Sequence, residues 1–211
     1  MKRLGPQFFE TPTLQLAECL LGKIFVRSEG PGKPLLKGRI VETEAYLAAG
    51  DEASHAWRGV TARNRAMFGP PGTLYIYLSY GCHYLANVVS EPEGAAGAVL
   101  LRAMEPVEGI GQMCLNRGVE DPLSLMSGPG RLTRALGIGP DLYGESLSGP
   151  HCWLEDAPEV PAGMIGTSQR IGISRSTRLP WRKFVIGSPH VSGARHAARQ
   201  KKGASGLESR K

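Results

Sequence analysis

Two carboxylates and a tyrosine recur at every second position of residues 39–46, RIVETEAY, an otherwise mostly apolar segment. Side chains alternate between the two faces of a β-strand, so Glu42, Glu44 and Tyr46 would share one face. Val41, Thr43 and Ala45 would share the other. The first face predicts a carboxylate that acts as a general base in a cleft, beside an aromatic ring. A solvated sheet face with a basic cross-strand partner is the alternative, and this segment taken alone favours it.

An arginine and a histidine add to this pattern. Arg102 interrupts the apolar run AVLLRAM, and a guanidinium in such a run needs an ionic partner. Glu44 is the expected partner, which fits a structural salt bridge and a catalytic pair equally well. His55 follows in DEASHAWR, where we expect Asp51 to cap a short helix. A lone histidine is more often structural than catalytic.

Residues 73–89, TLYIYLSYGCHYLANVV, predict a β-hairpin with a tyrosine at its tip. Gly81 provides the positive φ that a tight turn after Tyr80 requires. An amphipathic ring at such a tip can enter a stack of nucleic-acid bases as a wedge. Tyr77 could then stack on a base that has left the duplex. An ordinary aromatic turn residue is the alternative.

Metal and phosphate motifs are missing from the sequence. His83 follows Cys82 and Cys152 follows His151, but there is no CxxC or HxxxH spacing, and adjacent strand residues point apart. The sequence also lacks GxxxxGK[ST] and GxSxG. We therefore expect neither a metal nor a cofactor.

Short elements must position these residues. The 28 glycines and 16 prolines among 211 residues exclude a helical bundle, and no apolar run approaches the ~20 residues of a membrane span. Strands and helices alternate without a βαβ rhythm, which predicts an α+β fold around a mostly antiparallel sheet. Helices are expected over residues 11–22, 107–116 and 129–136, strands over 23–27, 35–46 and 97–104, and short extended pieces at 185–186 and 191.

The positive charge is concentrated at the C-terminus. Residues 194–211 carry five of the six net positive charges, which leaves residues 1–193 close to neutral. We expect a domain over 1–193 and a basic, disordered tail over 194–211. The tail is either a phosphate-seeking arm or a solubilising end. Four cysteines without paired spacing, and no hydrophobic stretch behind the charged N-terminal residues, predict a reducing compartment and no secretion.

Seven blocks in order resemble the alkyladenine (3-methyladenine) DNA glycosylase family of the non-helix-hairpin-helix type, found in animals and many bacteria. The resemblance extends from about residue 4 to residue 192. The blocks are RIVETEAY (39–46), DEASHA (51–56), ARNRAMF (62–68), PGTLYIYLSYG (71–81), LLRAMEP (100–106), SGPGRL (127–132) and GSPHVS (187–192).

This resemblance implies a role for each matching residue. Glu44 would be the general base that activates water, and Arg102 would help to hold that water, together with a backbone carbonyl at Cys152. The base pocket would comprise Tyr46, His55, Tyr77, Asn87 and Cys152. Tyr80 would enter the duplex where the flipped nucleotide was, with Cys82 beside it in place of the methionine of the animal proteins. The resemblance also places Arg131 near the DNA backbone. Arg63 and Arg65 are expected there for a different reason, because a body close to neutral must bind DNA through a local basic face.

The implied activity is that of a monofunctional DNA glycosylase. It would flip alkylated or deaminated purines out of duplex DNA and hydrolyse the N-glycosidic bond with water, leaving an abasic site, without metal or cofactor. The implied fold is a single α+β domain with a curved sheet, short surrounding helices and a protruding hairpin. We expect a monomer that binds damaged double-stranded DNA and no membrane, in the cytoplasm at the nucleoid or, in a eukaryote, in the nucleus.

Two other functions remain open at this stage. A carbohydrate-active hydrolase could use Glu42 and Glu44 as its acid pair, although both project from one strand. A non-enzymatic nucleic-acid-binding module would need Tyr80 and the tail, while Glu44 would be structural.

Overall fold

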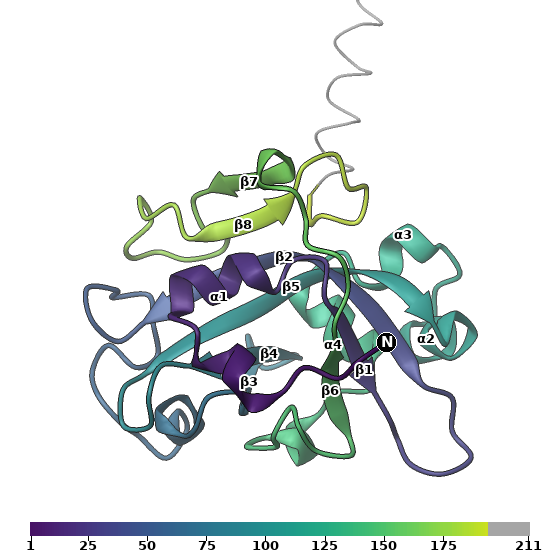
Figure 1. The fold of residues 1–211 in the computed structure, drawn as a ribbon, viewed down its shortest axis with the longest axis horizontal. Helices are drawn as coiled ribbons and strands as arrows, with labels where there is room; N and C mark the ends of the chain where they lie inside the picture. The colour runs from purple at the N-terminus through teal and green to yellow at the C-terminus, as the bar shows by residue number, and fades with distance from the viewer. Residues whose placement is uncertain (194–211) are drawn as a thin grey trace, which may run out of the picture.

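One antiparallel sheet dominates the computed structural model of this protein, which describes residues 1–193 (Figure 1). Its main strand order is β3-β4-β5-β2-β1-β6, and β8 joins it to β7. The strands are β1 (Ile24–Arg27), β2 (Leu36–Leu47), β3 (Leu74–Ser79), β4 (His83–Ser90), β5 (Gly97–Glu108), β6 (Cys152–Glu155), β7 (Ile165–Ser168) and β8 (Arg182–Val185).

The sheet branches at β2, its central strand. One edge of β2 pairs with β5 over nearly its whole length. Along the other edge, residues 36–39 pair with β1 and residues 42–44 pair with β8. Figure 1 shows β7 and β8 lying above α1 and β2 as a result. The sheet therefore curls into a half-barrel, and the expected α+β domain with a curved antiparallel sheet is confirmed.

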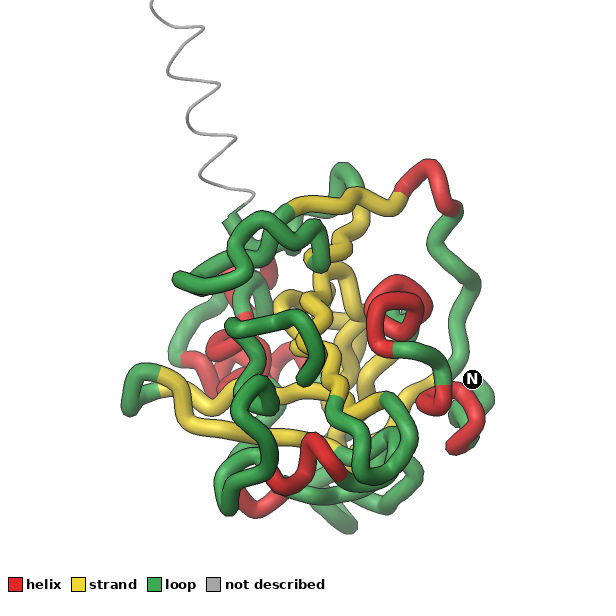
Figure 2. The backbone as a smooth tube through the Cα atoms, turned by 90° about the vertical axis from the view of Figure 1, so that its left-hand side faces the viewer, coloured by secondary structure: helices red, strands yellow, loops and turns green. Residues whose placement is uncertain are grey.

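Short helical segments surround the strands (Figure 2). The α-helices are α1 (Thr13–Cys19), α2 (Ile110–Arg117), α3 (Pro122–Leu125) and α4 (Pro129–Ala135). The 3₁₀ segments are η1 (Pro6–Glu10), η2 (Arg65–Phe68), η3 (Pro140–Leu142) and η4 (Ala162–Met164). Within residues 1–193, no helix is long and apolar enough to cross a membrane.

Two expected helix starts are wrong by two or three residues. Thr11 does not cap α1, because its hydroxyl donates to the Phe8 carbonyl and Pro12 takes the N-cap position. The second helix begins at Ile110 rather than 107, because β5 runs on to Glu108. Gly109, at φ 77°, then separates the strand from the helix.

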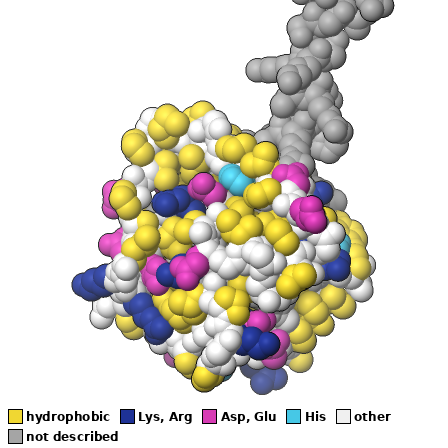
Figure 3. Space-filling view, turned by 90° about the vertical axis from the view of Figure 1, so that its right-hand side faces the viewer, with side chains coloured by type: hydrophobic (Ala, Val, Ile, Leu, Met, Phe, Trp, Pro, Cys, Tyr) yellow, Lys and Arg dark blue, Asp and Glu magenta, His cyan; other side chains and the backbone are white. Residues whose placement is uncertain are grey.

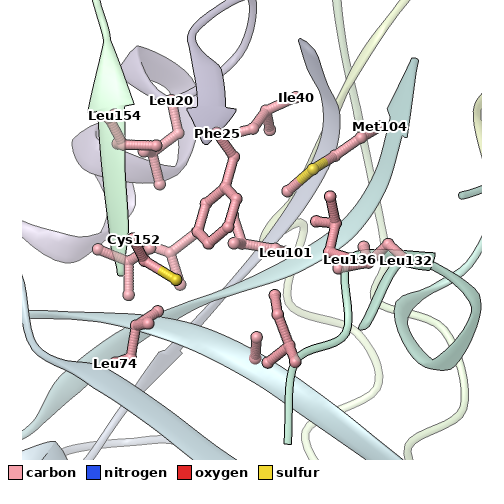
Figure 4. Packing of buried hydrophobic residues seen from close by; sticks show 14 of the residues in the cluster. Leu20, Phe25, Ile40, Leu74, Leu101, Met104, Leu132, Leu136, Cys152 and Leu154 are labelled. Carbon is pink, nitrogen blue, oxygen red and sulfur yellow. The ribbon is translucent and has the colours of Figure 1, made fainter. Parts of the chain in front are cut away.

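Buried apolar side chains from strands and helices meet in one main core, shown around Phe25 in Figure 4. Leu16 of α1 and Leu132 of α4 both belong to this core and are fully buried. Thr43 also faces it, where its hydroxyl donates to the Ala17 carbonyl over 2.6 Å and docks α1 onto β2. The face of β2 that carries Thr43 is thereby committed to packing, which leaves the opposite face for polar groups.

Acidic and basic side chains are interspersed on one face of the molecule, shown in Figure 3. On the face seen in Figure 3, they alternate with small apolar patches. This distribution agrees with a body close to neutral, as the sequence requires for residues 1–193. The basic tail expected over 194–211 lies outside the described residues.

Candidate active site

A cavity of about 720 Å³ opens between β2, the β3–β4 hairpin, α4 and the loop 171–175. It gathers seven of the residues singled out from the sequence. These lining residues are Tyr46, His55, Arg63, Tyr77, Tyr80, Arg102 and Arg131. Segments separated by more than a hundred residues in the chain thus meet at one site.

Glu44 lies directly behind three groups that line the cavity. Its Oε2 accepts hydrogen bonds from the Tyr46 hydroxyl at 2.9 Å and from Arg102 Nη1 at 3.2 Å. Its Oε1 accepts one from the Ile171 backbone N–H at 2.7 Å. The carboxylate is completely buried, and this burial raises its pKa above the ordinary glutamate value, although the charge of Arg102, the Ile171 N–H and the Tyr46 hydroxyl act in the opposite direction.

A second glutamate lies on the same face of β2. Glu42 is also completely buried, and Arg102 Nε donates to its Oε1 at 3.1 Å. Arg182 Nε of β8 donates to the same oxygen at 2.7 Å. We call Glu42, Glu44, Arg102 and Arg182 the carboxylate–guanidinium cluster. The expected Glu44–Arg102 pair is confirmed, whereas the alternative of a solvated face is wrong.

The strand register is interrupted at this cluster. The pairing of β2 with β5 shifts on both sides of Glu42 and skips Arg102. Such irregularities re-aim side chains and are frequent beside functional sites. Val41 consequently packs with Ala103 and Val191 in a small separate cluster instead of facing the main core with Thr43.

Aromatic rings form one wall of the cavity. Tyr77 stacks on Tyr75 with ring centroids 5.4 Å apart, and the His55 ring meets Tyr77 edge-on at 4.5 Å. His55 Nδ1 and the Tyr75 hydroxyl are 2.8 Å apart. Desolvation, and then the charge of Arg63, lower the pKa of His55, while burial raises the pKa of Tyr77 to about 12. The wall is therefore an uncharged aromatic surface at neutral pH.

The helix expected to carry His55 does not form. Residues 51–58 are a series of turns. Asp51 is fully buried, accepts from the Ala53 and Leu47 backbone N–H groups, and pairs with both terminal nitrogens of Arg170 at 2.6 Å. The carboxylate is needed for this ion pair, so the turn that holds His55 is set by a distant arginine rather than by a helix cap.

Arg170 is a residue that the sequence interpretation missed. It is buried, donates to the Ala45 carbonyl at 2.9 Å, and its guanidinium carbon lies 4.4 Å from the Tyr46 ring centroid. The adjoining Ile171 supplies the N–H that binds Glu44. Arg170 stands in a polar segment, SQRIGI, with no apolar run around it. No local signal therefore marks it, and only its contact with Asp51 reveals the role.

Asn87 and Cys152 do not line the cavity. Asn87 is buried on β4 beside the lining residue Leu100, and its amide donates to the Tyr75 carbonyl at 3.0 Å. Cys152 lies in the main core near Phe25 (Figure 4), where burial raises its pKa to about 12.

The placement of Cys152 corrects the expectation that its carbonyl borders the base pocket. β1 separates β6 from β2, so Cys152 lies on a strand away from Glu44. The backbone beside Glu44 comes instead from Ile171.

The hairpin tip projects an unsupported ring. Tyr80 is 90% exposed and has φ 48°, followed by Gly81 with φ 69°. The Cys82 N–H donates to the Ser79 carbonyl at 3.2 Å and closes the turn. Two successive positive φ angles are those of a type I′ turn, which fixes the direction of the tip. Cys82 is exposed beside the tyrosine.

Arginines surround the opening of the cavity. Arg63 donates to the Leu78 carbonyl at 3.0 Å, and Arg131 donates to the Ser127 hydroxyl at 3.0 Å. Arg117 and Arg175 also line the cavity, although neither was singled out from the sequence. Arg65 is exposed at the start of η2 and does not line it. Within residues 1–193, no three His, Cys, Asp or Glu side chains are grouped as a metal site would require.

Comparison with known proteins gives the class and then the family. A family model described as methylpurine-DNA glycosylase matches residues 7–189. A protein of Chlorobaculum parvum is 68% identical over 210 residues, which cover 100% of both chains. One of Chlorobaculum tepidum is 66% identical over 209 residues, 99% of this chain and 100% of that protein. Both carry the name "Putative 3-methyladenine DNA glycosylase".

The curled α+β domain is therefore a DNA glycosylase. More narrowly, the chain belongs to the methylpurine-DNA glycosylase family. The family expected from the seven sequence blocks is confirmed, and with it the enzyme class.

Proposed function

We propose that this enzyme flips an alkylated or deaminated purine out of duplex DNA and hydrolyses its N-glycosidic bond, leaving an abasic site. One observation carries the proposal. Glu44 is a fully buried carboxylate whose three hydrogen-bond donors, Tyr46, Arg102 and the Ile171 N–H, all belong to residues that line the cavity. A carboxylate held in this way is suited to taking a proton from one bound water molecule.

The chemistry requires little more than this proton transfer. The bond between the base nitrogen and C1′ breaks through an oxocarbenium-like state, and the departing base keeps the bonding electrons. A cationic alkylated base thereby leaves as a neutral molecule, whereas a neutral deaminated base must also take up one proton from solvent. Water adds its oxygen to C1′ and gives one proton to Glu44. Arg102 Nη1 already donates to Glu44 Oε2, so the same guanidinium is placed to orient the water. No step uses a metal or a cofactor.

Base recognition is assigned to the aromatic wall. Tyr77 and Tyr46 line the cavity, and His55 meets Tyr77 edge-on. Electron-rich rings attract a cationic, alkylated purine more strongly than a neutral one. A cationic base also leaves more easily, because it departs as a neutral molecule. We therefore place 3-methyladenine and similar cationic lesions first among the substrates.

Flipping is assigned to the hairpin tip and to the arginines. The exposed ring of Tyr80 stands on a rigid turn beside Cys82 and fits the gap that an extruded nucleotide leaves. Arg63 and Arg131 at the cavity, and Arg65 nearby, would contact phosphates of the duplex. We propose that the active form is a monomer, because the cavity needs no residue from a second chain to be lined on the sides that the proposed chemistry uses.

The two alternative functions fit the contacts less well. A carbohydrate-active acid pair needs both carboxylates free to face a substrate, but Glu42 is buried and accepts from Arg102, Arg182 and Ser192. A purely DNA-binding module gives no reason to bury Glu44 behind an open cavity.

The test is base release from duplexes that each carry one lesion, followed by alkali to cut at abasic sites. The wild-type protein should release 3-methyladenine, and Glu44→Gln should lower the single-turnover rate by about 10²–10⁴. Lesion-duplex affinity should stay within a few fold. Glu155→Gln is the matched control, since it neutralises a buried glutamate of β6 that pairs with Lys37. Near-normal excision by Glu44→Gln would refute the assignment.

A further inference from the structure

Glu42 is a completely buried side chain that accepts four hydrogen bonds and that the proposed chemistry does not use. Its Oε1 accepts from Arg102 Nε at 3.1 Å, Arg182 Nε at 2.7 Å and Ser192 Oγ at 2.7 Å. Its Oε2 accepts from the Ser192 N–H at 2.6 Å. These donors come from β5, β8 and the segment that follows β8. A carboxylate with four donors from three segments holds those segments in fixed positions.

Arg102 is divided between the two glutamates by this arrangement. Its Nε binds Glu42, its Nη1 binds Glu44, and its Nη2 lies 3.4 Å from Ser192 Oγ. The guanidinium therefore gives Glu44 a single hydrogen bond. An arginine without a competing partner often forms two parallel hydrogen bonds to one carboxylate, which is the stronger geometry. Glu42 is the contact that prevents Arg102 from turning fully onto Glu44.

We propose that Glu42 is a positioning residue: it holds back Arg102 so that Glu44 keeps the proton affinity that a general base requires. This inference rests on the proposed function. Without the charge of Glu42, Arg102 would pair with Glu44 through both terminal nitrogens. The loss of a neighbouring negative charge would act in the same direction, since Glu42 itself raises the pKa of Glu44. Both effects would make Glu44 a weaker base.

Other groups that face Glu44 also contribute to its proton affinity. Burial is the largest cause of its raised pKa, and the Ile171 N–H and the Tyr46 hydroxyl oppose it. Arg182 lies on β8 directly opposite Glu44 of β2. The remaining charged or titratable neighbours on the packed elements are Tyr77 on β3 and Arg170 behind Tyr46. A Glu42 variant keeps the other groups but also releases Arg182, which binds Glu42 through Nε, so a change in proton affinity would report on both arginines and on the charge of Glu42.

The experiment is the pH profile of single-turnover excision of a cationic lesion by Glu42→Gln. We expect the acid limb to move to lower pH by about one unit, and the rate on the plateau to fall by less than about tenfold as the base weakens. Glu42→Asp keeps the charge and should return the limb towards the wild-type position. Glu155→Gln, the buried control, should leave the limb unmoved even where it lowers stability.

Each other outcome has a defined meaning. An unmoved limb in folded Glu42→Gln would overturn the proposal. Loss of excision at every pH, with lesion binding kept, would also overturn it by making Glu42 itself a reacting group. If Glu42→Gln does not fold, Arg182→Gln decides the question. With Arg182 gone, Glu42 would draw Arg102 away from Glu44 and the limb should move up, so a downward shift or none would count against the proposal.

This test can fail independently of the proposed function. If the wild-type protein releases no alkylated base, or if Glu44→Gln remains active, the proposed function fails. If Glu44 is required and the Glu42→Gln profile matches the wild type, only the inference about Glu42 fails.

Discussion

Behind the cavity, Glu44 is completely buried and receives hydrogen bonds from three directions, whereas in front of it Tyr80 is 90% exposed. The carboxylate–guanidinium cluster is complete within the protein: each carboxylate has its donors before any substrate arrives. The ring at the tip has only its turn geometry. The folded protein therefore preorganises Glu44, the group proposed for chemistry. Tyr80, the group proposed for flipping, would gain its contacts only from DNA.

The largest expected effect is on the free energy of unfolding, and it concerns a buried ion pair. Arg170→Met removes the ionic partner that the fully buried Asp51 has within residues 1–193. An uncompensated buried carboxylate lowers the free energy of unfolding by about 3–5 kcal/mol. Thermal and chemical denaturation would measure this loss.

The matched control for Arg170→Met is Arg175→Met in the same loop. Arg175 pairs with Glu52 at 3.5 Å, and both side chains are about half exposed, so the cost should be about 0–1 kcal/mol. Equal losses from the two variants would mean that burial of the Asp51–Arg170 pair adds nothing.

The next effect lies at the tip. Tyr80→Ala should leave the unfolding free energy unchanged, because the ring contacts almost no protein. It should weaken flipping by about 1–3 kcal/mol, the range for loss of one stacked ring. A fluorescent base analogue at the lesion would report flipping directly, with Leu115→Ala, which removes an exposed side chain of α2 outside the cavity lining, as a control. Unchanged fluorescence and excision rate would reduce Tyr80 to a turn residue.

A smaller effect follows from the raised pKa of Glu44. The base acts as a carboxylate, so excision of a cationic lesion should fall as the pH drops through that raised pKa, above the range of an ordinary glutamate. Tyr46→Phe removes a hydrogen bond that lowers the pKa of Glu44 but keeps the ring. Its acid limb should therefore lie at higher pH than in the wild type. A limb at lower pH would contradict this account of the site.

The smallest effect concerns residues 194–211. Their five net positive charges should add DNA affinity without changing lesion choice, and each phosphate contact steepens the log–log salt dependence by about 0.9. Truncation after Gly193 should reduce the magnitude of that slope by at most a few times about 0.9. Excision by saturating enzyme at low salt should stay constant. The same slope in both proteins, or loss of excision by the folded truncated protein, would rule out this role.

Several parts of the site were predictable because they depend on local periodicity. The alternation of RIVETEAY placed Glu42, Glu44 and Tyr46 on one face of β2, and the hairpin 73–89 formed with Tyr80 at its turn. Arg102 required an ion partner in an apolar run, and Glu44 is one of the two that it has. These predictions hold because a strand fixes side-chain direction within a few residues.

The misplaced expectations involve contacts between distant segments. Asp51 looked like a helix cap, but a buried bond to Arg170, 119 residues away, uses its carboxylate instead. Cys152 was placed at the pocket, whereas the order of the strands puts it in the core beyond β1. Neither the Asp51–Arg170 pair nor the position of Cys152 in the core can be predicted from the neighbouring residues.

The sequence by itself determined the family, the α+β class, the face of β2 that carries the two glutamates and the turn that carries Tyr80. The family follows from the resemblance of the seven blocks, and the other three follow from residue type and short-range periodicity. Only the tertiary structure decided that Arg102 is shared between Glu42 and Glu44, and that the loop after Arg170 closes over Glu44. The physical reason is that a buried charge takes whichever partner the folded chain brings within hydrogen-bond distance, and the curl of the sheet sets that distance.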